Sequence, residues 1–259
     1  MRADVYLVEH GYAESRTRAS RLISEGKVNI DGSVITKPSA DISDGEHTVT
    51  LTDTDKYVGR GGLKLEHAIE CFSVDVRGKR CIDVGASTGG FTDCLLQNGA
   101  AHVCAVDSGN GQLHSKLLSD SRVSSYEGYN ARNLAAATLG MFEIAVMDVS
   151  FISQTLIHPA LSGVIKDGGI FISLIKPQFE AGRSAIGKNG IVKNSRDREN
   201  AVIRVIDSAR LCGFKLIGAI RSPIKGGDGN TEYLACFIKQ TTDENAVMSK
   251  SVDIKALCK

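Results

Sequence analysis

Residues Asp83-Val84-Gly85-Ala86-Ser87-Thr88-Gly89-Gly90-Phe91 form the stretch that decides the fold. They follow the apolar segment Cys81–Val84 and lead into a predicted helix at Thr92–Gln97, and Asp107 closes the next apolar segment. Glycines in a turn between a strand and a helix let a ligand approach the backbone, and an acid after the second strand can bind a ribose diol. An ordinary tight turn is the alternative, but the strand, the helix and Asp107 together favour a ligand site.

Apolar strands and helices alternate from about residue 60 onward, which indicates a parallel α/β sheet. A long helix is predicted at Asp197–Cys212, whereas the last two strands have only a loop between them. That arrangement suits a doubly wound, Rossmann-like sheet whose seventh and last strand is antiparallel. The predicted strands are Cys81–Val84, His102–Val106, Arg122–Tyr126, Ile144–Met147, Ile170–Ile175, Lys215–Ala219 and Tyr233–Ile238.

The first 52 residues have a different pattern, which predicts a small α+β unit. Two short helices are expected, and the second starts after a Ser15 cap and ends at Gly26. Short strands follow, the first two joined by a tight turn at Asp31-Gly32. We therefore predict an N-terminal domain over 1–52, a linker over 53–62 and a larger domain over 63–259.

The composition is that of a globular protein and argues against several classes of protein. The 259 residues are 42% hydrophobic and 24% charged, with a net charge of +1, so any basic surface for a nucleic acid must be local. The seven cysteines lack the spacing of a metal site, and their odd number fits a reducing compartment. No apolar run approaches the ~18 residues of a membrane span, and the N-terminus lacks a signal-peptide pattern. We expect a cytoplasmic protein with no metal and no membrane segment.

The glycine turn also distinguishes between cofactors. A dinucleotide enzyme would favour the spacing G-x-G-x-x-G, whereas this turn has Gly85-Ala86-Ser87-Thr88-Gly89-Gly90. Asp83 precedes the turn, and its carboxylate suits a ligand with a positive ammonium and sulfonium better than a pyrophosphate. The sequence therefore favours S-adenosylmethionine over NAD.

Three further polar residues stand at strand ends. Asp148 ends one predicted strand, Lys176 ends another, and Glu232 immediately precedes the last. Alone, Asp148 could cap a helix and Lys176 could be a surface lysine. Because ligands bind at the carboxyl edge of such sheets, we expect these residues to share a site with Asp83 and Asp107.

The whole chain resembles the TlyA family of ribosomal RNA 2′-O-methyltransferases, historically called hemolysins, which have an S4 RNA-binding domain and an FtsJ-like catalytic domain. The S4-like segments are Arg2-Ala3-Asp4, Ser15–Ala19, Gly26–Val28 and Asp31-Gly32. The segments that match the catalytic motifs are Arg60–Leu65, Asp83–Phe91, Asp148–Ser153, Lys176–Glu180 and Gly229–Tyr233.

The resemblance implies a catalytic tetrad of Lys64, Asp148, Lys176 and Glu232. Methyl transfer to a ribose hydroxyl needs in-line geometry and help with a weakly acidic proton. We assign that help to Lys176, as a base or as an orienting group, with Lys64 as the second cation. The expected cofactor-binding residues are Asp83, Gly85, Ala86, Ser87, Gly89, Gly90, Phe91, Asp107, Asn130, Ala131 and Asp148.

Ribosomal RNA, free or within a subunit, is the partner that the resemblance implies. Residues 1–52 contain six Lys and Arg against eight Asp and Glu, but Arg16, Arg18 and Arg21 cluster on one predicted helix with Lys27 just beyond it. Such clustering suits phosphate contact. Without the resemblance, a solvated helix face would be the simpler interpretation.

Three other functions were weighed. A membrane-active cytolysin would need an amphipathic or apolar membrane segment, which the sequence lacks. A non-catalytic RNA-binding assembly factor would not need the intact tetrad, and a small-molecule methyltransferase would not need the S4-like unit. The sequence leaves open the modified nucleotide, the ribosomal subunit and the oligomeric state.

Overall fold

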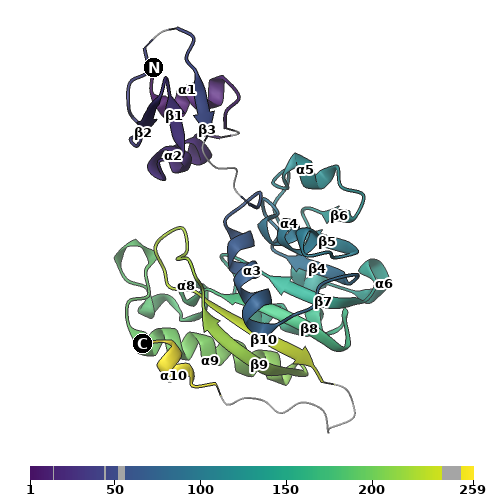
Figure 1. The fold of residues 1–259 in the computed structure, drawn as a ribbon. Coiled ribbons are helices and arrows are strands. Elements are labelled where there is room, and N and C mark those ends of the chain that lie inside the picture. Colours follow the sequence, from purple (N-terminus) through teal and green to yellow (C-terminus); the bar gives the residue numbers. More distant parts are fainter. Residues whose placement is uncertain (14, 44, 52–55, 241–251) are drawn as a thin grey trace. The chain divides into compact units, whose positions relative to one another are not determined.

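The computed structural model describes residues 1–259 except 14, 44, 52–55 and 241–251. It contains two compact units, Met1–Asp55 and Lys56–Lys259 (Figure 1). Residues 53–55 of the predicted linker lie outside the described residues, and residues 56–62 belong to the second unit. Tyr57 explains this assignment, because it is only 3% exposed and packs in the same apolar cluster as Leu65.

The first unit has two helices and a three-stranded antiparallel sheet of order β2-β1-β3 around one apolar core that includes Leu7 and Leu22. Ser15 Oγ accepts a hydrogen bond from Arg18 N at 3.3 Å, so the second helix starts at the predicted cap. Asp31 and Gly32 have positive φ, which the tight turn requires. The elements are α1 (Ala3–Glu9), α2 (Arg16–Ser24), β1 (Val28–Ile30), β2 (Ser33–Ile35) and β3 (Val49–Leu51).

The second unit is built on a seven-stranded sheet of order β6-β5-β4-β7-β8-β10-β9. Its last strand is antiparallel to both neighbours, which confirms the predicted fold. The strands are β4 (Arg80–Val84), β5 (His102–Val106), β6 (Val123–Tyr126), β7 (Phe142–Met147), β8 (Ile165–Ile175), β9 (Phe214–Arg221) and β10 (Tyr233–Lys239). The helices are α3 (Gly61–Phe72), α4 (Gly90–Gln97), α5 (Ser115–Leu118), α6 (Ala136–Leu139), α7 (His158–Ser162), α8 (Pro177–Glu180), α9 (Ser195–Leu211) and α10 (Ile254–Leu257).

Among the strands of the large sheet, β8 differs most in length from the prediction. β8 begins at Ile165, whereas the apolar pattern indicated a start at Ile170. The additional segment Lys166–Gly169 is polar and mostly exposed, so it carries no apolar periodicity. It is part of the strand because Ile165 pairs with Phe142 of β7 before the register shifts.

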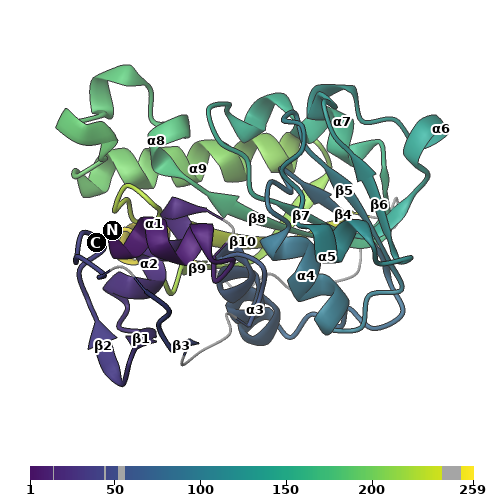
Figure 2. The ribbon, with the colours of Figure 1, turned by 90° about the horizontal axis from the view of Figure 1, so that it is seen from above.

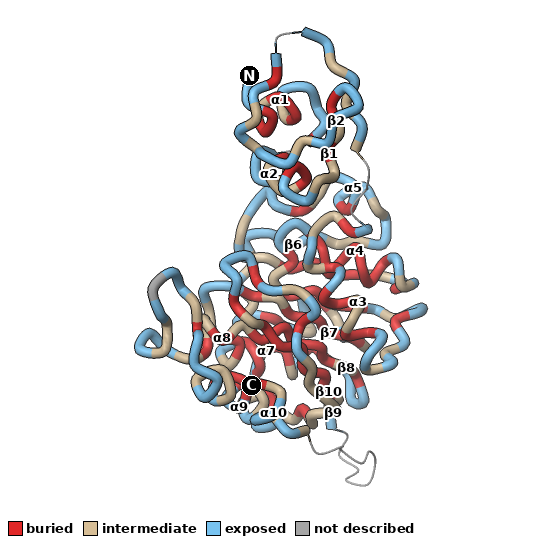
Figure 3. The backbone as a smooth tube through the Cα atoms, turned by 60° about the vertical axis from the view of Figure 1, so that its left-hand side comes forward, coloured by how far each residue is buried: buried red, intermediate tan, exposed pale blue. Residues whose placement is uncertain are grey.

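Each face of the sheet is covered. Phe171 of β8 contacts Phe214 and Phe237 in the core that includes residues of α9. Its neighbour Ile172 lies in the other core, together with Leu65 of α3. Figure 2 shows α9 on one side of the strands and α3 with α4 on the other, and Figure 3 shows that the central strands between them are largely buried. Successive residues of such a strand therefore meet different helices.

Candidate active site

The turn after β4 is packed too tightly for side chains at its first glycine. Gly85 has φ +85°, and a Cβ there would lie 2.6 Å from the carbonyl oxygen of Asp148. Its backbone N–H donates to Val106 O at 2.8 Å, while Ser87 N–H donates to Asp107 Oδ2 at 2.8 Å. The turn therefore joins the ends of β4, β5 and β7 at the carboxyl edge of the sheet.

Two adjoining cavities open at this edge. The larger has a volume of about 420 Å³ and is lined by predicted cofactor residues, namely Gly85, Ser87, Asp107, Asn130, Ala131 and Asp148. The smaller, about 180 Å³, is lined by Gly85, Ala86, Ser87, Gly90, Phe91 and Asp148, and also by Ser150 and Lys176. Gly85, Ser87, Asp148 and Ser150 belong to both walls. Together the cavities fall in the size range of small-molecule sites.

Two predicted cofactor residues line neither cavity, Asp83 and Gly89. Asp83 is fully buried at the end of β4, where its Oδ2 accepts a hydrogen bond from Thr92 Oγ1 at 2.7 Å. Among the described residues, its Oδ1 has no hydrogen-bond partner. Burial is the main cause that raises the pKa of Asp83 to about 7; the nearby charges of Asp148 and Asp107 act in the same direction, and the Thr92 hydrogen bonds oppose them. Gly89 has φ +94°, and a Cβ there would overlap Leu117.

The four tetrad residues form two ion pairs. Lys64 Nζ of α3 lies 2.5 Å from Glu232 Oε2, and both residues are buried. Lys176 Nζ lies 2.5 Å from Asp148 Oδ1 and donates a hydrogen bond to Ser150 Oγ at 2.9 Å. Because Tyr233 pairs with Ile175, the antiparallel register places Glu232 beside Lys176 at the strand ends. The structure therefore brings all four residues to the same edge of the sheet.

Phe151 received no role in the sequence analysis, although it lies within a motif. It lines the larger cavity, is 93% exposed and has φ +64°, a left-handed conformation that is strained for an aromatic residue. Its ring lies 5.2 Å from that of Phe179, just after Lys176 in the chain. Exposure and strain together are the signals that mark it, and neither is visible in the sequence.

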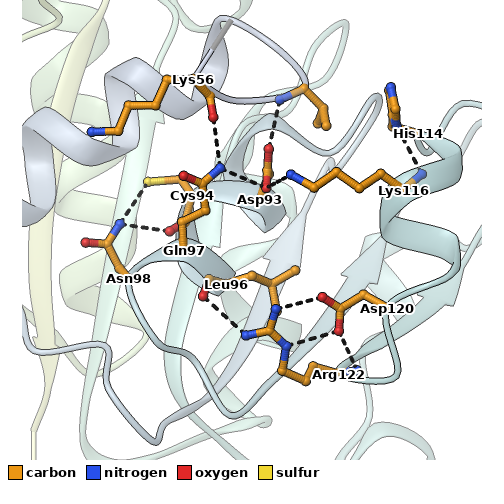
Figure 4. Close-up of polar contacts among 11 residues, drawn as sticks. Lys56, Asp93, Cys94, Leu96, Gln97, Asn98, His114, Lys116, Asp120 and Arg122 are labelled. Atoms are coloured by element: carbon orange, nitrogen blue, oxygen red, sulfur yellow. Dashed lines mark hydrogen bonds and ion pairs between the residues drawn. The ribbon is translucent and has the colours of Figure 1, made fainter. Parts of the chain in front are cut away.

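The segment before α3 is attached to α4. Asp93 of α4 is buried, and its carboxylate accepts hydrogen bonds from Val58 N at 2.9 Å, from Gln97 Nε2 and from Lys116 Nζ (Figure 4). Gln97 Nε2 also donates to Lys56 O at 2.8 Å. These hydrogen bonds hold residues 56–58 against α4, the helix that follows the glycine turn.

The four predicted RNA-binding residues lie on or next to α2 in the first unit, and several have acidic partners. Arg16 Nη2 lies 3.1 Å from Asp4 Oδ2, and Lys27 Nζ lies 3.1 Å from Glu25 Oε2. Arg21 Nε is 3.9 Å from the same Glu25 side chain. The Arg2 and Arg16 side chains hold the pKa of the buried Asp4 carboxyl well below its usual range.

Comparison with known proteins identifies the class of protein first. Residues 57–239 match the family of FtsJ-like methyltransferases, and residues 1–47 match the S4 domain. The chain therefore belongs to the FtsJ-like methyltransferase family and has an S4 domain at its N-terminal end.

Individual relatives extend the similarity to nearly the whole chain. The 16S/23S rRNA (cytidine-2′-O)-methyltransferase TlyA of Mycobacterium tuberculosis is 41% identical over 254 residues, which are 97% of this chain and 94% of that protein. Hemolysin A of Brachyspira hyodysenteriae is 43% identical over 92% of this chain and 100% of that protein. A solved structure from Streptococcus thermophilus, which also carries the name hemolysin, is 44% identical with a TM-score of 0.78, and the match covers 100% of this chain and 94% of that one. The predicted resemblance to the TlyA family is confirmed.

None of the described helices combines the length and the apolar character needed to cross a membrane. No group of three or more His, Cys, Asp or Glu side chains in the described part of the chain is arranged to hold a metal ion.

Proposed function

We propose that this chain transfers a methyl group from S-adenosylmethionine to the 2′-hydroxyl of a cytidine ribose in ribosomal RNA, in the cytoplasm. The observation that carries the proposal is the position of the Lys176–Asp148 pair: Asp148 belongs to both cavity walls, and Lys176 lines the smaller cavity next to it. A cation and a carboxylate are thus held where two ligands can meet. The relatives named for rRNA cytidine 2′-O-methylation support the choice of substrate.

S-adenosylmethionine has an adenosine half and an amino-acid half, and each of the two cavities suits one of them. The larger cavity suits the adenosine: Asp107 would bind the ribose diol, and Asn130 and Ala131 would hold the base. Both Asp107 oxygens already accept backbone N–H groups, from Ser87 and Gly109, but each retains a lone pair for a hydroxyl. The smaller cavity suits the amino-acid half, because Asp83 lies directly before the glycine turn that lines it, and a positive ligand would favour the ionised form of this buried carboxyl.

The residues around Lys176 supply the chemistry that the acceptor needs. When bound, S-adenosylmethionine provides a methyl group activated by its sulfonium. Lys176, held by Asp148 Oδ1 and Ser150 Oγ, orients the ribose hydroxyl or receives its proton. Lys64 and Glu232 form the second pair, which places a further cation near the same strand ends. Holding the hydroxyl in line with the methyl group lowers the entropic part of the barrier to transfer.

Two features suit RNA as the acceptor. Phe151 presents an exposed ring at the cavity, backed by Phe179, and an unstacked base can stack on such a ring. The S4 domain carries Arg16, Arg18, Arg21 and Lys27, which we propose contact phosphates of the same RNA.

The test is methyl transfer to ribosomal subunits with a matched pair of variants. Purified protein and labelled S-adenosylmethionine are incubated with each subunit from cells lacking this protein, and the 2′-O-methylated positions are mapped. Lys176→Ala should lower the rate of labelling by about 10²–10⁴-fold. Lys166→Ala is the control, because Lys166 forms a comparable ion pair with Glu143 at the opposite end of the same strands. No labelled nucleotide with the wild-type protein on either subunit would refute the proposal.

A further inference from the structure

A buried polar network connects the two loops that carry the catalytic side chains. Glu180, the last residue of α8, is only 2% exposed. Its Oε1 accepts a hydrogen bond from Gln154 N at 2.9 Å, and its Oε2 accepts one from Ser153 Oγ at 2.5 Å. One carboxylate from the loop after β8 thus holds two consecutive residues of the loop after β7.

Gln154 extends this network into the sheet. It is 1% exposed, its Nε2 donates to Leu174 O at 2.6 Å, and its Oε1 accepts from Ser173 Oγ. The ladder between β7 and β8 ends at the pair Met147–Ser173, and the residue after β7, Asp148, donates its N–H to Val84 O of β4. The Gln154 side chain therefore continues the hydrogen bonding of β8 where its neighbouring strand stops.

Neither Glu180 nor Gln154 lines the two cavities, so they act only through other residues. The loop that they hold carries Asp148, Ser150 and Phe151, and Lys176 directly precedes α8. A fully satisfied buried network is rigid, and the positions of its members are coupled. We propose that Glu180 and Gln154 form a clamp that sets the position of Lys176 relative to Asp148 and Ser150 for methyl transfer. This inference rests on the function proposed above.

Glu180 is buried although it is polar, which indicates that it positions its neighbours and does not simply fill space in the core. Burial raises the pKa of Glu180, and the hydrogen bonds from Ser153 and Gln154 oppose that rise. Arg204 of α9 donates to the backbone oxygen of Glu180 at 2.8 Å, which fixes the end of α8 from the other side. A leucine would fill the same volume without burying polar groups, but it could not hold the backbone of Gln154.

The experiment compares Glu180→Ala, Glu180→Gln and Ser173→Ala with Glu143→Gln. Glu143 is the matched control, since it also accepts one backbone N–H and one side-chain donor, from Arg80 and Lys166, but at the opposite end of β7. Glu180→Ala should lower kcat by about 10- to 100-fold, with KM for RNA and for S-adenosylmethionine within about two-fold of wild type. Glu180→Gln should recover most of kcat, because its amide oxygen can still accept the Gln154 N–H. Ser173→Ala removes only one hydroxyl group and is the least disruptive of these changes to the fold. It should give a smaller loss of kcat.

Hydrogen exchange gives a readout that does not depend on activity. Amides of residues 149–156 should exchange faster in Glu180→Ala than in wild type and remain unchanged in Glu143→Gln. If wild type methylates no RNA while this exchange difference is present, the proposed function fails and the clamp stands as a structural device for another reaction. Unchanged exchange and unchanged kcat in folded Glu180→Ala and Ser173→Ala would overturn the clamp. A loss confined to KM would also overturn it, because the residues would then serve binding.

Discussion

Lys64 and Glu232 lie 168 positions apart in the sequence, and their side chains form an ion pair with the Nζ and Oε2 atoms 2.5 Å apart. The pair ties the first turns of α3 to the entrance of β10. Their side chains are 10% and 3% exposed, so little solvent screens the two charges. Such a pair is sensitive to the loss of one partner, because the other charge is then buried without compensation.

Lys64→Met should therefore lower the free energy of unfolding by about 3–5 kcal/mol, whereas Lys64→Met combined with Glu232→Leu should recover much of that loss. Both variants should be inactive, since the second cation is missing. Urea denaturation measures the first effect and methyl transfer the second. Arg77→Ala is the control, because the side chains of the Arg77–Asp75 pair are 81% and 59% exposed, so that solvent screens the two charges. A double variant as unstable as the single one would contradict this account.

Lys176→Ala should reduce kcat by about 10²–10⁴-fold if the amine takes part in proton transfer. Affinity for S-adenosylmethionine, measured by calorimetry, should survive, because the glycine turn and Asp107 are unchanged. Lys176→Arg keeps the charge but cannot become neutral, so it separates a base from an orienting cation. If the arginine variant retains most of the activity, Lys176 orients the hydroxyl; if the alanine variant retains it too, the tetrad assignment is wrong.

The pKa of Asp83, raised by burial to about 7, predicts a dependence of stability on pH. Between about pH 4 and pH 7 the folded protein keeps a proton that the unfolded chain has released, so its free energy of unfolding falls as pH rises. The decline from this group should end above the folded-state pKa and amount to at most about 4 kcal/mol. Asp83→Asn should remove it. Urea denaturation at pH 5 and pH 8 without cofactor compares the two proteins, and equal pH dependence would contradict the prediction.

Phe151 should contribute to RNA turnover and hardly to stability. Base stacking on an aromatic ring is worth about 1–3 kcal/mol, so Phe151→Ala should lower kcat/KM for RNA by roughly 10- to 100-fold. Phe151→Tyr should retain activity, since its ring is equally flat. Leu211→Ala, at a residue 87% exposed on α9, is the control for the loss of a surface apolar side chain. Normal turnover by Phe151→Ala would exclude a stacking role.

The S4 domain can be tested separately from catalysis. Replacing Arg16, Arg18 and Arg21 by alanine should weaken RNA binding and reduce its salt dependence, by about one unit of slope per lost phosphate contact. Cofactor affinity should not change. Because Arg16 also pairs with the buried Asp4, the thermal unfolding of the triple variant must be measured in parallel. Lys37→Ala, outside α2, is the control. Unchanged RNA affinity in a folded triple variant would remove the S4 domain as the RNA-binding module.

The hydrophobic periodicity of the sequence predicted the apolar strands and helices. It did not predict strand residues that are polar, because these carry no hydrophobic pattern. All seven strands of the large sheet were located, but the start of β8 was missed because Lys166–Gly169 is exposed. The segment at 56–62 looked like a linker because its glycines suggest a turn. Its place in the second unit depends on Tyr57 and Asp93, which are far apart in sequence.

The site was predictable as residues on one edge, because parallel strands place their carboxyl ends together. The sequence did not predict which lysine pairs with which carboxylate, because that pairing depends on side-chain directions across α3, β7, β8 and β10. The clamp at Glu180 was also invisible, because a glutamate ending a short helix has no local sign that it is buried.

The tight approach of Gly85 to Asp148 limits how this site could be redesigned. The backbone oxygen of Asp148 leaves no room for even one methyl group at position 85, and the Asp148 N–H is bonded to Val84 O. The wall that the glycine turn shares with Asp148, the aspartate of the proposed tetrad, therefore cannot recede to admit a side chain at this position. An enzyme intended to accept bulkier sulfonium donors would have to be enlarged at other lining residues of the cavity, such as Asn130 and Ala131.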